Sequence, residues 1–360
     1  MLSALNAFRF FAIVMMYFHH LEYHIGFGSS AVTFFFVLSG FIMAYNYDLK
    51  FICLDAKEFK HFLIKRLSKI YPLHILTFIV SWPILYIINF QINIGYAVSN
   101  FFLLQSYFPI GISVFSFNAP SWFISDMVFF YFLTPFLLHV LYRYKISQSP
   151  KALLLLSIIV FICETAIAYL FFNPSYSFGW WLVYISPYIR IFDYIIGISF
   201  GLFFIAIENR FFNNSNHYIL FSILEVLAVL SACTSIYCSR YFPFTSLLWS
   251  VYSILFSVIL LLIFAFQKGI ISSILSQKMF VHLGNLSFTI YMIHQLVIYY
   301  TQFYFLSPIS GMAFELKHFI SQLLLLFVII CLADVINRYF VEPLKKRIIA
   351  LSLIRYSQCN

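Results

Sequence analysis

Charged residues are scarce in this chain. Of its 360 residues, Asp, Glu, Lys and Arg make up only 9%, whereas hydrophobic residues make up 63%. Because a soluble domain carries about 25% charged residues, this composition excludes an ordinary soluble protein. Apolar runs long enough to cross a bilayer recur along the whole sequence, which is typical of a polytopic membrane protein. We therefore expect an all-α transmembrane helix bundle.

The chain also has little that would build a metal site or a disulfide framework. Its six cysteines are scattered and form no CxxC pair, so we expect neither. We find no low-complexity linker and no internal repeat, and we expect no appended soluble domain. The first apolar segment lacks the basic start and the cleavage site of a secretory signal peptide. We predict one transmembrane domain over residues 1–345 and a short basic cytoplasmic tail over residues 346–360.

About ten spans fit the hydropathy pattern. Lysine and arginine mark the cytoplasmic loops of membrane proteins, and most of the 21 basic residues fall on one side of this arrangement. Only Arg240 and Lys317 fall on the opposite side, while Arg9 and Arg190 lie within spans. Both termini are therefore predicted to be cytoplasmic. The net charge of +9 then reflects topology and contact with membrane lipids, and we expect no nucleic-acid partner. The predicted spans are Ala4–Leu21, Ala31–Lys50, Leu67–Phe90, Trp122–Tyr142, Ala152–Phe172, Trp180–Ile207, His217–Cys238, Ser246–Phe266, Leu286–Leu306 and His318–Tyr339.

The first span contains an arginine, Arg9, and ends in a histidine pair that includes His20. A charge at membrane depth costs roughly 2.5–3.5 kcal/mol, so it often marks function. Eleven residues of α-helix turn to within about 20° of three full turns and rise roughly 16 Å. Arg9 and His20 therefore share one helix face, near opposite sides of the bilayer. The alternative is that Arg9 reaches the nearer headgroups and that His20 lies in the wet interface.

The densest basic segment is Lys57–Pro72, in which apolar residues recur at helical spacing. Two interpretations fit this pattern. The segment alone favours an amphipathic helix held against anionic lipid headgroups. The functional alternative is a platform for a phosphorylated cytoplasmic ligand.

Several other polar residues fall inside predicted spans. Asp126 is a functional candidate because an acid at membrane depth is costly. Arg190 and Asp193 have the spacing of an ion pair on one helix. Ser39, followed by glycine, favours close helix packing over nucleophilic chemistry. His294 is either a lining residue or a packed, hydrogen-bonded histidine. The sequence assigns no role to two further acids, Glu164 and Glu225.

Six motifs, taken together and in this order, resemble bacterial membrane acyltransferase family 3, the group containing O-acetyltransferases of surface polysaccharides. The matches cover almost the whole chain, and ten spans is the usual count in that family. The most specific of them is the FFFVLSGF block. The motifs are Arg9 with His20, Phe34–Phe41 (FFFVLSGF), Arg66–Pro72 (RLSKIYP), Ser121–Asp126 (SWFISD) with Phe130, Tyr131 and Pro135, Arg190–Asp193 with Gly197 and Gly201, and Leu283–Phe288 (LGNLSF) with Tyr291 and His294.

The chain departs from the family pattern at a few positions. Asn6 stands where the family often has a carboxylate three residues before the arginine. Asp126 replaces the commoner glutamate, and Lys69 stands where arginine is commoner. We expect no soluble esterase-like domain of the kind that some members carry. Any final handling of the acyl group then falls to the membrane domain or to a separate periplasmic partner.

The resemblance implies transfer of an acyl group, usually acetyl from cytoplasmic acetyl-CoA. Arg66, Lys65 and Lys69 would hold the anionic phosphates of this donor, with the planar guanidinium of Arg66 best suited. Arg9 would grip a phosphate or polarise the thioester carbonyl. No metal is implied. The implied acceptor is a hydroxyl of a cell-surface or lipid-linked glycan, and the implied location is the bacterial inner membrane.

The resemblance also implies a role for His20 at the outer side. A neutral imidazole there can act as general base on the acceptor hydroxyl, or it can carry a transient acyl group. Asp126 would orient His20 or pair with a basic group. Ser39, Arg190 and His294 are ranked lower, as further lining candidates.

Two other functions remain open on the sequence. In a transporter or flippase, the same polar stripe would conduct a lipid-linked sugar or a proton. In an assembly subunit of an envelope complex, it would have no chemical role. Neither explains why the FFFVLSGF block accompanies the arginine–histidine spacing. The acceptor glycan, the acyl chain and the oligomeric state cannot be read from the sequence.

Overall fold

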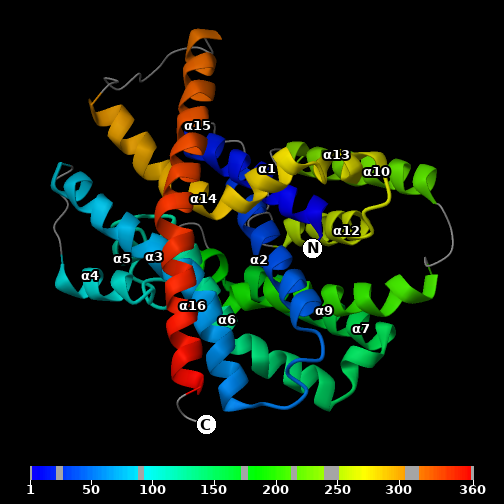
Figure 1. Ribbon diagram of the computed structural model, residues 1–360. Coiled ribbons are helices and arrows are strands. Elements are labelled where there is room, and N and C mark those ends of the chain that lie inside the picture. Colours follow the sequence, from blue (N-terminus) through cyan, green and yellow to red (C-terminus); the bar gives the residue numbers. More distant parts are fainter. Residues whose placement is uncertain are drawn as a thin grey trace. The chain divides into compact units, whose positions relative to one another are not determined.

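The computed structural model describes residues 2–21, 27–87, 93–171, 177–211, 217–238, 251–304 and 316–357. Every regular element in these ranges is a helix, so the all-α prediction is confirmed (Figure 1). The α-helices are α1 (Ser3–His20), α2 (Phe27–Tyr47), α3 (Ala56–Ile87), α4 (Ile94–Phe101), α5 (Gly111–Val114), α6 (Ser121–Arg143), α7 (Pro150–Phe171), α8 (Ser177–Trp180), α9 (Pro187–Phe211), α10 (Tyr218–Cys238), α12 (Tyr252–Ala265), α13 (Ile270–Leu275), α14 (Lys278–Tyr304), α15 (Leu316–Ile336) and α16 (Glu342–Ser357). Three short turns complete the elements, the 3₁₀ helix η1 (Ile146–Gln148) and the π-helices η2 (Trp181–Ile185) and η4 (Asn337–Val341).

Within the described residues, six helical stretches are long and apolar enough to cross a membrane. The ten predicted spans coincide with helices over most of their described residues; Trp180–Ile207 covers η2 and α9, which Ser186 separates. Parts of four predicted spans lie outside the described residues, and the count of ten and the cytoplasmic termini stay predictions. The six stretches are Gly28–Tyr47, Ala56–Tyr86, Ser121–Arg143, Pro150–Phe171, Phe178–Glu208 and Phe319–Ser352.

The chain folds into two compact units, each formed from two segments. Unit 1 comprises Met1–Phe59 and Asp126–Gly284, and unit 2 comprises Lys60–Ser125 and Asn285–Asn360. The division falls inside α3, α6 and α14, so these three helices contribute to both units. The predicted tail begins inside α16, where Lys345 pairs with Glu342 at 2.8 Å.

Unit 1 is organised around a close contact between α2 and α9. A Cβ added to Gly40 of α2 would lie 2.1 Å from the Tyr194 carbonyl oxygen, and one added to Gly197 of α9 would lie 2.1 Å from the Val37 carbonyl oxygen. Only a residue without a side chain allows two helix backbones to approach this closely, as is common in membrane bundles. Gly40 belongs to the FFFVLSGF block, so this block packs helices, as Ser39–Gly40 predicted.

A second feature of unit 1 explains Glu225, to which the sequence assigned no role. Glu225 of α10 is fully buried, and its carboxylate accepts hydrogen bonds from the backbone N–H groups of Gly269 at 3.1 Å, Ile271 at 2.8 Å and Ser272 at 3.1 Å. The Ser272 hydroxyl donates to it as well. The acid therefore caps the first turn of α13, where backbone N–H groups otherwise lack partners.

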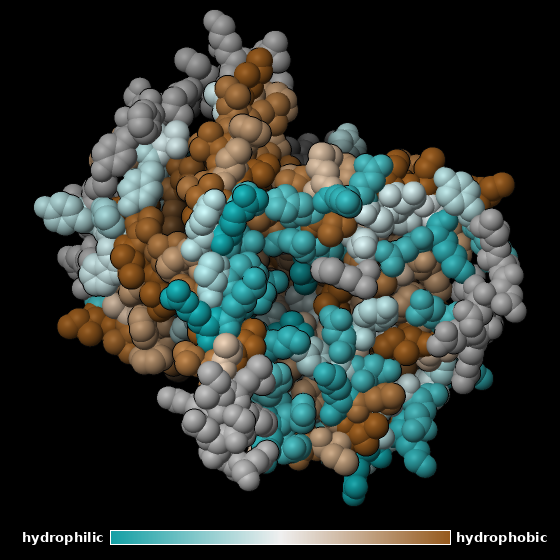
Figure 2. Space-filling view, in the orientation of Figure 1, coloured by the Kyte–Doolittle hydropathy of each residue, from teal (hydrophilic) through white to brown (hydrophobic). Residues whose placement is uncertain are grey.

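Unit 2 contains α4 and α5, α15 and α16, and most of α3 and α14. A small apolar cluster of Phe78, Leu85 and Phe117 joins α3 to the segment between α5 and α6. The helix α3 continues through Pro72 and Pro83. Along α15, large apolar side chains such as Leu324 and Phe327 are exposed, and Figure 2 shows this hydrophobic surface in brown. Such a surface fits contact with hydrocarbon.

Candidate active site

The predicted polar stripe lies on a single unbroken helix. Because α1 runs from Ser3 to His20 without interruption, the eleven-residue spacing holds, and Arg9 and His20 share one face. Both side chains are partly exposed. Between them on that face, Ile13 is 1% exposed and Met16 is 3% exposed. The stripe is therefore turned toward the protein, not toward lipid.

The two histidines that end α1 have different surroundings. Their rings lie 5.6 Å apart. The His19 ring packs against the start of α2, since a Cβ added to Gly28 would lie 2.5 Å from His19 Cδ2. His20 lies on the Arg9 face, whereas His19 points about 80° away from Arg9. The structure thus separates a packed histidine from one that ends the polar stripe.

Asn6, one of the residues that depart from the family pattern, ties α1 to α14. It is buried, and its side-chain amide donates a hydrogen bond to the Val281 carbonyl oxygen at 3.0 Å. A Cβ added to Gly284 would lie 2.1 Å from the Asn6 carbonyl oxygen. Asn6 therefore fixes the first turn of the helix that carries Arg9.

Asp126 lies in the second turn of α6, with its side chain fully buried. Burial of an acid at this depth is costly, which keeps it a candidate for a role in the reaction. Ser39, on α2, is 8% exposed and directly precedes the glycine of the α2–α9 contact. Its position fits packing.

The basic segment of α3 is amphipathic, as its periodicity predicted. Phe62 is buried, whereas Lys65 and Lys69 are exposed. The Arg66 guanidinium lies 5.6 Å from the centre of the Phe62 ring, which holds it by a cation–π contact. Lys65, Arg66 and Lys69 fall within about 100° of the helix circumference. This face of unit 2 offers closely spaced cations to an anionic ligand or to lipid headgroups.

Arg190 is enclosed in unit 1, and the predicted ion pair is present. Its Nη2 atom lies 2.9 Å from Asp193 Oδ2, and both side chains are fully buried. The same nitrogen donates to the Thr33 hydroxyl of α2 at 2.8 Å. The guanidinium lies 5.0 Å from the centre of the Phe36 ring. Glu164 of α7 is fully buried within electrostatic reach of this pair. These contacts describe an internal charge cluster that joins α2, α7 and α9.

His294 is a packed histidine of unit 2. It is fully buried in α14, and its Nδ1 atom lies 2.6 Å from the Tyr291 carbonyl oxygen one turn earlier. The Tyr291 hydroxyl donates to the Pro120 carbonyl oxygen at 3.0 Å, and the Asn118 amide donates to the Met292 carbonyl oxygen at 2.9 Å. The LGNLSF region thus holds the loop that precedes the SWFISD motif.

Sequence reasoning missed a buried polar network in unit 2. His74 Nε2 lies 2.9 Å from the Asn100 carbonyl oxygen, and the Asn100 amide donates to the Ser116 carbonyl oxygen at 2.8 Å. The Gln105 amide donates to the hydroxyl of Ser121, the first residue of the SWFISD motif, at 3.0 Å. The signal was available, because polar residues interrupt an otherwise apolar stretch. The network positions the start of α6, the helix that carries Asp126.

The structure is thus that of a helical membrane protein in which α1 carries an arginine and a histidine on one inward face. Comparison with known proteins gives its class. The chain matches the model of an acyltransferase domain, acyltransferase family 3, over residues 2–338. It therefore belongs to this family, and it is a multi-pass membrane protein.

The chain is also similar to a protein that is named as an acyltransferase. Over 113 residues the chain is 34% identical to acyltransferase MdmB of Streptomyces mycarofaciens, and the match covers 30% of this chain and 28% of that protein. No solved structure matches the chain. Among the residues that the structure describes, no group of three or more histidine, cysteine or acidic side chains could hold a metal ion.

Proposed function

We propose that the protein is an integral membrane O-acyltransferase of the bacterial inner membrane. It transfers an acyl group, with acetyl as the simplest case, from cytoplasmic acyl-CoA to a hydroxyl of a cell-surface or lipid-linked glycan. Membership of the acyltransferase family over residues 2–338 supports the reaction class. The observation that carries the proposal is the inward-facing stripe of α1, because Arg9 and His20 supply a cation and a base on one helix face.

In this proposal the donor binds through its phosphates. The α3 cations Arg66, Lys65 and Lys69 hold them, since a guanidinium binds phosphate oxygens in a bidentate manner. Arg9 grips a phosphate of the donor, about 16 Å along α1 from His20.

His20 acts on the acceptor. Its neutral imidazole takes the proton of the glycan hydroxyl, while the hydroxyl oxygen attacks the thioester carbon. The carbon–sulfur bond then breaks, and the CoA thiolate leaves and is protonated. Asp126 orients His20 or balances a nearby cation. In the second route, His20 itself takes the acyl group from CoA and passes it to the hydroxyl.

The test uses membranes that hold wild type or His20→Gln, supplied with labelled acetyl-CoA and an acceptor glycan extract. General-base catalysis contributes typically 10²–10⁴-fold, so we expect label in ester linkage to fall by about that factor. His19→Gln is the matched control, because the adjacent histidine packs against α2 and lies off the stripe; it should retain most activity.

Other outcomes would contradict the proposal. Equal, non-zero turnover in wild type and His20→Gln would remove His20 from the mechanism. An unchanged ester content of the envelope glycan in a deletion strain, together with a block in glycan export, would favour a transporter.

A further inference from the structure

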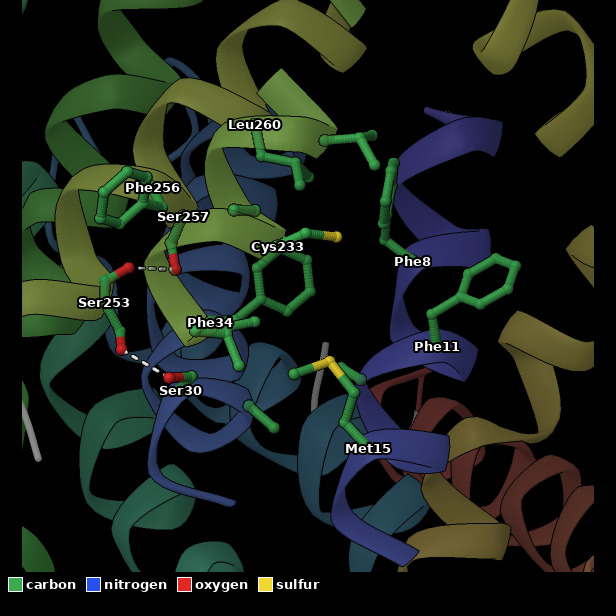
Figure 3. Close-up of a pocket in the computed structure, with 15 residues that line it drawn as sticks. Phe8, Phe11, Met15, Ser30, Phe34, Cys233, Ser253, Phe256, Ser257 and Leu260 are labelled. Atoms are coloured by element: carbon green, nitrogen blue, oxygen red, sulfur yellow. Dashed lines mark hydrogen bonds between the residues drawn. The ribbon is translucent and has the colours of Figure 1, made fainter. Parts of the chain in front are cut away.

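Unit 1 contains an apolar pocket bounded by α1, α2, α10 and α12. Its volume is about 170 Å³. Figure 3 shows Phe8 and Met15 of α1 on one side and Cys233, Phe256 and Leu260 of α10 and α12 on the other. The candidate mechanism uses none of these residues.

The few polar groups around the pocket are already engaged with one another. The hydroxyls of Ser30 and Ser253 are hydrogen-bonded at 2.8 Å. The Ser257 hydroxyl donates to the Ser253 carbonyl oxygen at 2.7 Å. These bonds are visible in Figure 3. Because the remaining lining side chains are apolar, the pocket offers hydrocarbon contacts to a ligand and few hydrogen bonds. It therefore suits an alkyl chain.

The pocket shares α1 with the polar stripe. Its lining residues Phe8, Ala12 and Met15 recur on one face of that helix. At about 100° per residue, Arg9 lies roughly 90° around the helix from the centre of this face, at nearly the same height as Phe8. The pocket therefore lies on the face of α1 that neighbours the Arg9–His20 stripe.

We propose that this pocket receives the hydrocarbon tail of the acyl group, and this inference rests on the proposed acyl transfer. An apolar cavity of about 150 Å³ holds a benzene molecule, so the pocket has room for roughly six carbons. Each buried methylene group raises affinity about fourfold. The protein should then accept acyl donors longer than acetyl and bind hexanoyl-CoA more tightly than acetyl-CoA.

Cys233 serves as a reporter of occupancy, since it lines the pocket and is exposed to reagents. The purified protein is treated with N-ethylmaleimide, and the modification of each cysteine is followed by peptide mass spectrometry. We expect hexanoyl-CoA to slow modification of Cys233 at least tenfold, acetyl-CoA to slow it less, and CoA to leave it unchanged. Exposed Cys163 and Cys331 are internal controls, because they do not line the pocket.

A pocket-filling variant gives a second, independent readout. Ala232→Phe places a ring in the pocket from α10. We expect it to keep acetyl transfer within about threefold while hexanoyl transfer falls at least tenfold, since roughly four methylene groups lose their contacts. Leu230→Phe is the matched control, because Leu230 is two residues away and 56% exposed. It should leave the ratio unchanged.

The outcomes separate this inference from the proposed function. Acetyl transfer with an unchanged chain preference in Ala232→Phe, and with Cys233 never protected, overturns the pocket and leaves the transferase standing. Protection of Cys233 by hexanoyl-CoA without transfer to any acceptor supports the pocket and counts against the transferase. A membrane phospholipid that copurifies and shields Cys233 at every acyl-CoA concentration identifies the occupant as a lipid tail and overturns the inference.

Discussion

Arg9 and Arg190 both lie inside predicted spans, and their surroundings differ. Arg190 is fully buried, paired with Asp193 and bonded to Thr33. Arg9 is partly exposed on the face of α1 that ends in His20. An arginine in an apolar helix therefore does not by itself define a site. At Arg190 the neighbouring groups make the charge part of the contact between helices.

The largest expected difference is in stability. Arg190→Met leaves Asp193 buried without its partner, and breaking a buried pair costs about 3–5 kcal/mol. Arg9→Met changes a partly exposed side chain, so we expect a loss of about 1 kcal/mol or less. Thermal unfolding of the purified protein in detergent measures both. Equal losses of stability in Arg9→Met and Arg190→Met would contradict the expected difference between the two arginines.

The second prediction removes both members of the buried pair. Contacting residues show coupling energies of about 0.5–3 kcal/mol. Adding Asp193→Asn to Arg190→Met should therefore restore part of the lost unfolding free energy, because the second change removes the unpaired acid. A double-mutant cycle measures the recovery. Simple additivity of the two losses would show that the pair is not the source of the effect.

The third prediction concerns the backbone contact that lies beside the Arg190 cluster. Gly197→Ala forces a methyl group against the Val37 carbonyl oxygen, and overpacking of this kind costs about 1–3 kcal/mol. Gly111→Ala is the control, because a Cβ there would meet no heavy atom within 4 Å; it should change stability by about 0.5 kcal/mol or less. Equal melting temperatures for the two variants would contradict the close contact.

The smallest effect is expected at Glu225, a buried charge that neutral backbone groups satisfy. Glu225→Gln keeps one acceptor oxygen for the α13 N–H groups, so we expect a loss of about 1 kcal/mol. Hydrogen exchange at Ile271 and Ser272 should accelerate, since their N–H groups donate to this side chain. A loss as large as that of Arg190→Met would mean that the charge itself is needed at this position.

Much of the fold was predictable because it depends on residues that are close together in the sequence. Apolar runs predicted the helices, the spacing of Arg190 and Asp193 predicted their ion pair, and Ser39–Gly40 predicted close packing. The amphipathic start of α3 followed from periodicity in the same way. The shared face of Arg9 and His20 needed only a continuous helix, which α1 provides. Their roles in acyl transfer stay predictions.

The rest depends on partners far away in the chain. Arg190 bonds to Thr33, 157 residues earlier, and Glu225 caps a turn that begins 44 residues later. The sequence does not show which distant residues meet in the fold, so Glu225 had no assigned role. Polar residues in an apolar stretch indicated the network of His74, Asn100 and Gln105, but their partners could not be read from the spacing. The pocket was also invisible, because four helices have to meet before it exists.

The touching backbones of α2 and α9 also bear on how this protein could be re-engineered. Neither Gly40 nor Gly197 can gain a side chain without separating two helices. Directed evolution toward new donors should therefore keep both glycines. It should randomise Ala232, Phe256 and Leu260, whose side chains line the apolar pocket. Such libraries would vary only positions where a change in side-chain volume does not force helices apart.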